Sequence, residues 1–118
     1  MLGLNGRNYM VEEITMSEAE FDRHLSQPQE PLLLFLWGKN CGISKKMEPL
    51  YDTCAIQNNG KAFFWKMNVN DHYWLVKKFR IQGTPTLIAF KEGKEIGRTL
   101  GYLEANALKE QVDHWLAK

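Results

Sequence analysis

The sequence LLLFLW, residues 32–37, is the feature that most limits how this chain can fold. All six residues are apolar, and apolar and polar positions do not alternate. A strand covered on both faces has this pattern, whereas a strand with one solvated face alternates. We therefore predict a central parallel strand over 32–37, which requires helices on both faces of its sheet.

Helices are predicted on both sides of this strand in the sequence. Ser17 begins the segment 17–27, and Glu20 follows three residues later, which is the pattern of a capping box. A second helix is predicted over 41–56, with apolar residues spaced to face a core. Pro49 lies inside this second helix, and we expect a kink there because proline lacks the N–H of a helical hydrogen bond.

The rest of the chain completes an α/β pattern. The remaining predicted elements are, in order, strand 11–15, strand 62–69, helix 72–79, strand 86–91, strand 95–100 and helix 103–117. Asp71 is expected to cap the short helix, and Gly93 to form the turn of a hairpin. The order β-α-β-α-β-α-β-β-α predicts a mixed central β-sheet flanked by helices on both faces. We expect one domain over 11–118 and an N-terminal arm over 1–10.

Composition excludes several classes of function. Fifteen Lys and Arg residues nearly balance fourteen Asp and Glu residues, and the basic stripe of a nucleic-acid-binding protein is absent. No apolar run approaches the roughly 20 residues that span a bilayer, and the N-terminus does not have the form of a signal peptide. Two cysteines do not make a disulfide framework. We expect a cytoplasmic protein with neither nucleic acid nor membrane as a partner.

The histidines and glycines indicate no cofactor. His24, His72 and His114 fall on three different predicted helices, so no metal-ligand spacing is present. The sequence also lacks a glycine-rich loop of the kind that holds phosphates. We predict neither a metal nor another cofactor.

Residues around one cysteine match a known family in register. They are Trp37 four residues before Cys41, Gly42 directly after it, Pro49, Lys66 in KMNV, Pro85 in GTPT (83–86), and Gly93 and Gly101 in FKEGKEIGRTLGY. Over residues 11–117, most of its length, the chain resembles the thioredoxin family. The resemblance implies a thioredoxin fold, an oxidoreductase active in thiol–disulfide exchange and cell redox homeostasis, and a cis peptide bond before Pro85.

Three departures from the family pattern affect the chemistry. The aromatic residue before the nucleophilic cysteine is Asn40 here. The second half of the family's Cys-Gly-Pro-Cys motif is Ile43 and Ser44. The buried carboxylate six residues before the nucleophile is Phe35. In the family this carboxylate is thought to take the proton of the second thiol, so the second thiol and its proton acceptor are missing together.

Cys41 and Ser44 are the expected catalytic residues. Cys41 should lie at the N-terminus of a helix, where free N–H groups and the helix dipole stabilise a thiolate. Ser44 is one helical turn later, and its hydroxyl could donate a hydrogen bond to that thiolate. A nearby positive charge on Lys39 would favour the same ionised state.

The resemblance also implies a substrate-binding surface and two supporting residues. The expected substrate-contacting residues are Trp37, Asn40, Gly42, Ile43, Thr84, Pro85 and Gly101, and the supporting residues are Lys66 and Phe35. In the family the backbone of the residue before the cis-proline, here Thr84, pairs with the substrate as a short added strand.

Cys54 is not expected to replace the missing thiol. It lies 13 residues after Cys41 on the same predicted helix, which corresponds to roughly 20 Å along the axis. A disulfide needs Cα atoms within about 7 Å. We therefore interpret Cys54 as a core residue.

The sequence predicts a protein that forms mixed disulfides through Cys41 alone. Expected partners are protein disulfides or thiols, with glutathione or a thioredoxin-reductase-type donor releasing the adduct; we expect a monomer. Whether this is an enzymatic oxidoreductase or isomerase stays open. Two alternatives also stay open: a Cys-Gly-Ile-Cys reductase in which a cysteine at position 44 was replaced to trap substrates, and a binding or assembly module in which the thiol is incidental.

Overall fold

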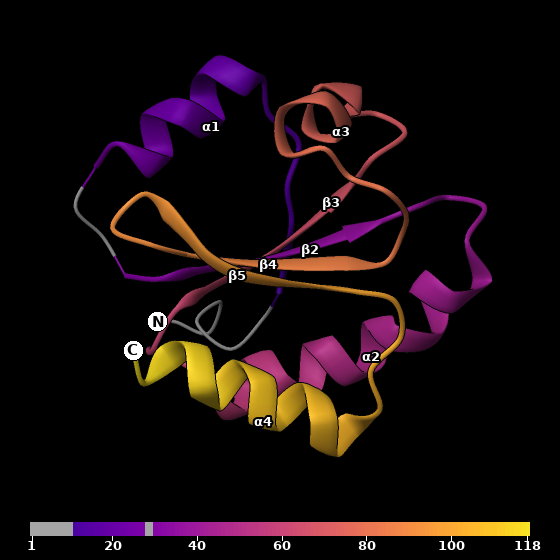
Figure 1. The fold of residues 1–118 in the computed structure, drawn as a ribbon, viewed down its shortest axis with the longest axis vertical. Helices are drawn as coiled ribbons and strands as arrows, with labels where there is room; N and C mark the ends of the chain where they lie inside the picture. Colours follow the sequence, from indigo (N-terminus) through magenta and orange to yellow (C-terminus); the bar gives the residue numbers. More distant parts are fainter. Residues whose placement is uncertain (1–10, 28–29) are drawn as a thin grey trace, which may run out of the picture.

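A computed structural model describes residues 11–27 and 30–118, and it has a mixed sheet with helices on both faces (Figure 1). The elements are β1 (Glu12–Glu13), α1 (Glu18–Leu25), β2 (Leu32–Trp37), α2 (Gly42–Gln57), β3 (Phe63–Asn68), α3 (Tyr73–Phe79), β4 (Thr86–Lys91), β5 (Lys94–Leu100) and α4 (Ala105–Leu116). The predicted element order and α/β class are confirmed. The expected arm over 1–10 lies outside the described residues, and the single-domain boundary at residue 11 stays a prediction.

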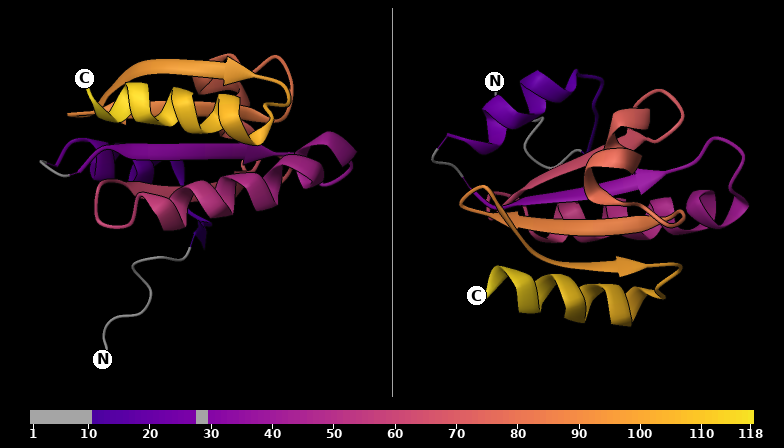
Figure 2. Two further views of the ribbon diagram at one scale, coloured as in Figure 1. Left: turned by 90° about the horizontal axis from the view of Figure 1, so that it is seen from below. Right: turned by 45° about the horizontal axis from the view of Figure 1, so that its top comes forward.

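The run LLLFLW forms the centre of the sheet. The strand order is β1-β3-β2-β4-β5, and β2 pairs parallel with β3 and antiparallel with β4. Helices α1 and α3 cover one face, and α2 and α4 cover the other (Figure 2). Leu33 and Phe35 face the α2–α4 side, while Leu32, Leu34 and Leu36 face the α1–α3 side. All five are buried, which explains why the strand is apolar at every position.

Local sequence signals set several element ends. The capping box predicted for α1 is present, since the Ser17 side chain accepts from the Glu20 N–H and the Glu20 side chain from the Ser17 N–H. The hairpin between β4 and β5 turns at Glu92 and Gly93, both with positive φ. Helix α2 continues past Pro49, in its interior, to Gln57.

Asp71 was expected to cap α3, and this expectation is wrong. The N-cap is His72, whose side chain makes no capping hydrogen bond. The carboxylate of Asp71 instead lies within hydrogen-bonding distance of the side chains of Asn68 and Lys39. None of the helices within residues 11–27 and 30–118 combines the length and the hydrophobicity that a membrane span requires.

Candidate functional site

Cys41 lies between the end of β2 and the start of α2. It is the N-cap residue of α2 and is partly exposed. Its thiol donates a hydrogen bond to the backbone oxygen of Thr84, at 3.3 Å. The peptide bond between Thr84 and Pro85 is cis, the isomer that the family resemblance implied. The fold therefore brings residues 41 and 84, far apart in the sequence, into direct contact.

The surroundings of the Cys41 sulfur favour the thiolate. The pKa of Cys41 is lowered from 9.0 to about 7, first by a hydrogen bond from the Ser44 side chain and next by one from the Thr84 side chain. The backbone N–H groups of Ser44 and Ile43, in the first turn of α2, lower it further, against a small opposing effect of burial. The thiolate is therefore accessible near neutral pH, where an unperturbed cysteine is almost entirely neutral.

Ser44 is buried and also supports the loop that presents Cys41. Its hydroxyl oxygen accepts a hydrogen bond from the N–H of Gly38, at 3.4 Å, and the Gly38 oxygen accepts one from the N–H of Cys41, at 3.1 Å. A Cβ atom at position 38 would lie 3.0 Å from Thr84 Oγ1 and 3.4 Å from Cys41 Cβ. The absence of a side chain at Gly38 thus lets the Thr84 segment approach the cysteine.

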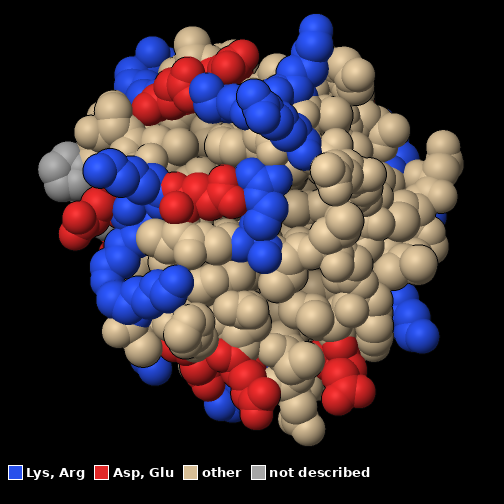
Figure 3. Space-filling view, viewed as in Figure 1, with Lys and Arg blue, Asp and Glu red and all other residues tan. Residues whose placement is uncertain are grey.

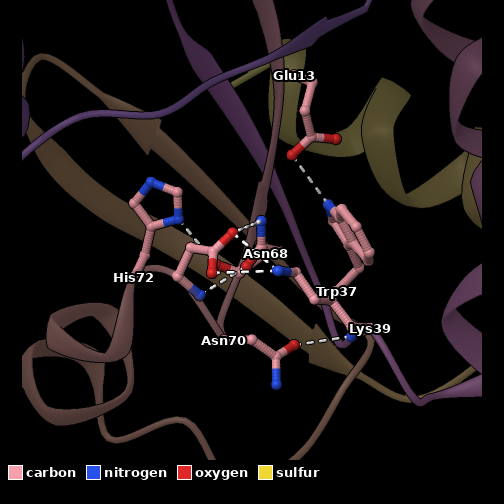
Figure 4. Close-up of polar contacts among 7 residues, drawn as sticks. Glu13, Trp37, Lys39, Asn68, Asn70 and His72 are labelled. Carbon is pink, nitrogen blue, oxygen red and sulfur yellow. Dashed lines mark hydrogen bonds and ion pairs between the residues drawn. The ribbon is translucent and has the colours of Figure 1, made fainter.

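A polar network that the sequence did not predict holds this loop from the other side (Figure 4). The side-chain oxygen of Asn70 accepts from the N–H of Lys39, at 2.8 Å, and the Lys39 ammonium pairs with Asp71 at 3.1 Å. The Trp37 backbone oxygen accepts from the N–H of Val69, and the Trp37 indole donates to Glu13, at 3.1 Å. Asn70 and Asp71, between β3 and α3, were the sequence feature that could have indicated this network.

Lys39 takes part in this network. Its ammonium pairs with Asp71, and it is not among the main causes of the lowered pKa of Cys41, which are hydrogen bonds from residues 43, 44 and 84. The network continues through His72, a buried residue whose ring nitrogens contact the Asn68 oxygen at 2.8 Å and the Met16 N–H at 3.3 Å. It thus ties the loop before Cys41 to the segment between β1 and α1.

The other expected substrate-contacting residues lie on either side of the cysteine. Asn40, Gly42 and Ile43 are exposed at the start of α2, with Ile43 53% exposed. Gly101 has φ 98°, and its N–H donates to the Pro85 oxygen at 2.8 Å. Figure 3 shows a broad uncharged area on the right, over the end of the molecule where α2 begins.

Comparison with known proteins places this arrangement in a family. The sequence pattern named Thioredoxin matches residues 12–114. The thioredoxin of Haemophilus influenzae is 30% identical over 104 residues, covering 88% of this chain and 97% of that protein. The thioredoxin of Pseudomonas aeruginosa is 27% identical over 100 residues, covering 85% and 93% respectively. The chain belongs to the thioredoxin family. This membership supports thiol–disulfide exchange as the general chemistry of the site.

In this member of the thioredoxin family, the position of the buried carboxylate is purely apolar. Phe35 is fully buried and stacks on Tyr51, with ring centroids 5.0 Å apart. Its neighbour in the parallel register is Lys66, whose ammonium pairs with Glu48 at 2.5 Å and Asp52 at 3.4 Å. Burial opposes the charge on Lys66, but these two carboxylates raise its pKa overall. The carboxylates that balance the charge of Lys66 thus come from α2, because position 35 on β2 carries no carboxylate.

Cys54 does not take part in the site. It is buried at 4% exposure on the α4 side of α2, and burial raises its pKa to about 11. Neither cysteine is in a disulfide. A thiol that is neutral at physiological pH and shielded from solvent is a poor nucleophile, so the expectation of a core residue agrees with its surroundings.

Proposed function

We propose that this member of the thioredoxin family carries out thiol–disulfide exchange through Cys41 alone, by way of a mixed disulfide. The observation that carries the proposal is the Cys41 sulfur itself. It is partly exposed, lies at the start of a helix, has a pKa of about 7 and contacts the Thr84 segment. A thiol whose pKa lies near ambient pH is the most effective attacking thiol.

The proposed first step is attack by the Cys41 thiolate on one sulfur of a substrate disulfide. The substrate S–S bond breaks, a bond forms between Cys41 Sγ and that sulfur, and the second substrate thiolate leaves and takes a proton from water. No electron is lost or gained overall, because one disulfide replaces another. Ser44 and the first-turn N–H groups keep Cys41 ionised before the attack.

Release is proposed to need an outside thiol. Ser44 cannot attack the mixed disulfide to form a second S–S bond, and Cys54 is buried on the same helix. A thiolate of glutathione, of the substrate or of a reductase-type donor attacks the mixed disulfide and returns Cys41 to its thiolate. We place this chemistry in a reducing cytoplasm, which supplies such thiols, and we propose that the chain acts as a monomer.

Intact-protein mass spectrometry tests the proposal. The reduced protein is mixed with bis(2-hydroxyethyl) disulfide at pH 7, and the adduct mass is followed with time. We expect one adduct, on Cys41, which persists after the disulfide is removed and disappears when glutathione is added. The variants C41A and C54A serve as controls, and only C41A should lose the adduct. Failure of Cys41 to react faster than a cysteine in an unstructured peptide would overturn the proposal and leave a binding role.

A further inference from the structure

A cleft lies beside the segment that contacts Cys41. It has a volume of about 190 Å³ and is lined by Arg80, Gln82, Thr86, Arg98 and Leu100. Gln82 and Thr86 flank residues 83–85, and Thr84 within that segment contacts the Cys41 sulfur. The cleft is smaller than the pockets of about 300–1,000 Å³ that hold drug-sized ligands. It is therefore of a size for one side chain of a longer substrate.

The two arginines give this cleft a positive charge. Arg98 is fixed by three contacts: Nε and Nη2 donate to Glu95 at 2.6 and 2.8 Å, and Nη1 donates to the Phe79 oxygen at 2.8 Å. These leave one N–H on each Nη atom, because a guanidinium has five N–H donors. Glu95 offsets the charge of Arg98, so the net charge comes from Arg80.

Arg80 has no carboxylate partner within the described part of the chain. It follows α3 directly and has a left-handed backbone, with φ 54° and ψ 52°. Arg80 is an exposed residue, and a guanidinium can pair with a carboxylate through two parallel hydrogen bonds. Leu100, 57% exposed, adds an apolar wall and lies 3.5 Å from where a Cβ of Gly83 would be.

We propose that this cleft binds an acidic side chain of the disulfide-bearing peptide segment that reacts with Cys41. The inference rests on the proposed function and names its substrate class, a protein segment with Glu or Asp near the reacting cysteine. In an extended peptide, residues two positions apart lie about 6.6–6.8 Å apart and on the same side. A segment whose cysteine reacts at Cys41 and that runs along residues 83–85 would therefore bring a side chain two residues away toward the cleft, whose lining includes Gln82 and Thr86 on either side of that stretch.

Two matched peptide disulfides test this. Each is the symmetrical disulfide of a blocked pentapeptide with the reacting cysteine at its centre, one with Glu at both ends and one with Gln. Rates of adduct formation at pH 7 are measured by mass spectrometry and divided by the rates of the same peptides with 2-mercaptoethanol, which removes intrinsic differences in reactivity. The proteins are the full chain, R80Q, and K77Q, which removes a charge from the last turn of α3, outside the cleft.

We expect the full chain to favour the Glu peptide by about two- to fivefold, the range of exposed ion pairs. R80Q should abolish the preference and K77Q should retain most of it, and the preference should shrink at high salt. Equal rates for both peptides, or equal losses in R80Q and K77Q, would overturn the acidic-segment inference and leave the single-thiol function intact. If neither peptide reacts with Cys41, the proposed function itself fails.

Discussion

The ionisation of one sulfur depends on two hydroxyl groups. Ser44 lies on α2 and Thr84 in the loop before β4, and both side chains favour the Cys41 thiolate. The Thr84 carbonyl, in contrast, accepts a hydrogen bond only from the neutral thiol. Serine in the place of the second cysteine is therefore more than a missing thiol, because it is the largest single cause of the lowered pKa.

Replacing Ser44 by Ala should raise the pKa of Cys41 from its present value of about 7. The alkylation rate, measured against pH, should then have its midpoint at higher pH, since less thiolate is present at neutral pH. At pH 7 we expect the alkylation rate to fall by about two- to fivefold. The fall is smaller than the loss of thiolate alone would give, because the thiolate of a weaker acid is a somewhat better nucleophile.

S17A is the matched control for this prediction. Ser17 caps α1 with the same type of hydroxyl contact but lies outside the site. The S17A variant should unfold at a lower urea concentration, while the pH midpoint of Cys41 alkylation stays unchanged. An unchanged midpoint in S44A, together with a native unfolding curve, would show that Ser44 does not stabilise the thiolate.

The second thiol should behave in the opposite way. Burial raises the pKa of Cys54 to about 11, so its thiolate fraction at pH 8 is small. In the native protein at pH 8, an alkylating reagent should modify Cys41 within minutes and leave Cys54 unmodified until urea is added. Peptide mapping of the labelled protein measures this, and equal labelling of both cysteines under native conditions would contradict the packing described for α2.

At the scale of elements, α4 depends on close contact with the edge strand β5. A Cβ atom at Gly97 would lie 2.9 Å from Cε2 of Trp115, a residue that is only 3% exposed, and would also overlap its Nε1. G97A should therefore lower the free energy of unfolding by about 1–3 kcal/mol, as overpacking does. Urea unfolding measures this, with G42A as the control, because a Cβ at Gly42 meets nothing within 4 Å.

The sequence predicted elements better than it predicted contacts between loops. LLLFLW and the capping box at Ser17 are local patterns, and both gave the correct element. Asp71 was assigned to a local role as a cap, but in the fold its carboxylate pairs with Lys39, 32 residues away in the sequence. His72 contacts the Met16 N–H over 56 residues in the same way. Local patterns hold no information on such pairs, because they form only when the loops at one end of the sheet come together.

The candidate site was predicted in part for the same reason. Cys41 and Ser44 lie one turn apart, so their interaction could be anticipated from spacing alone. The proximity of Thr84 to Cys41 came only from resemblance, since 43 residues separate them. The role of Gly38 was missed, because it depends on the Thr84 hydroxyl being 3.0 Å from where its Cβ would be.

At the scale of the whole molecule, two absences act together. Under the proposed function, a mixed disulfide on Cys41 has no neighbouring thiol to resolve it, because Cys54 is buried, and the core position that would take a proton from such a thiol is Phe35, packed on Tyr51. Restoring the second thiol without a core carboxylate at position 35 should therefore allow release of the bound substrate, but only slowly at neutral pH. S44C places a thiol one helical turn from Cys41 on the same helix end.

The S44C variant should release a bound substrate without an added thiol. With bis(2-hydroxyethyl) disulfide, the adduct should be replaced by a disulfide between Cys41 and the new cysteine at position 44, seen as the loss of two hydrogen atoms relative to the reduced protein, while 2-mercaptoethanol is released. Release should be slow near neutral pH, because residue 44 is buried at 1% exposure and Phe35 cannot accept its proton. It should speed up as pH rises and the new thiol ionises. Adding F35D should speed release at pH 7 but lower stability, since an isolated carboxyl in an apolar core is costly. If the S44C adduct persists at high pH as long as that of the unsubstituted chain, the helix end does not bring the two sulfurs together, and the missing cysteine is not the reason for the proposed single-thiol mechanism.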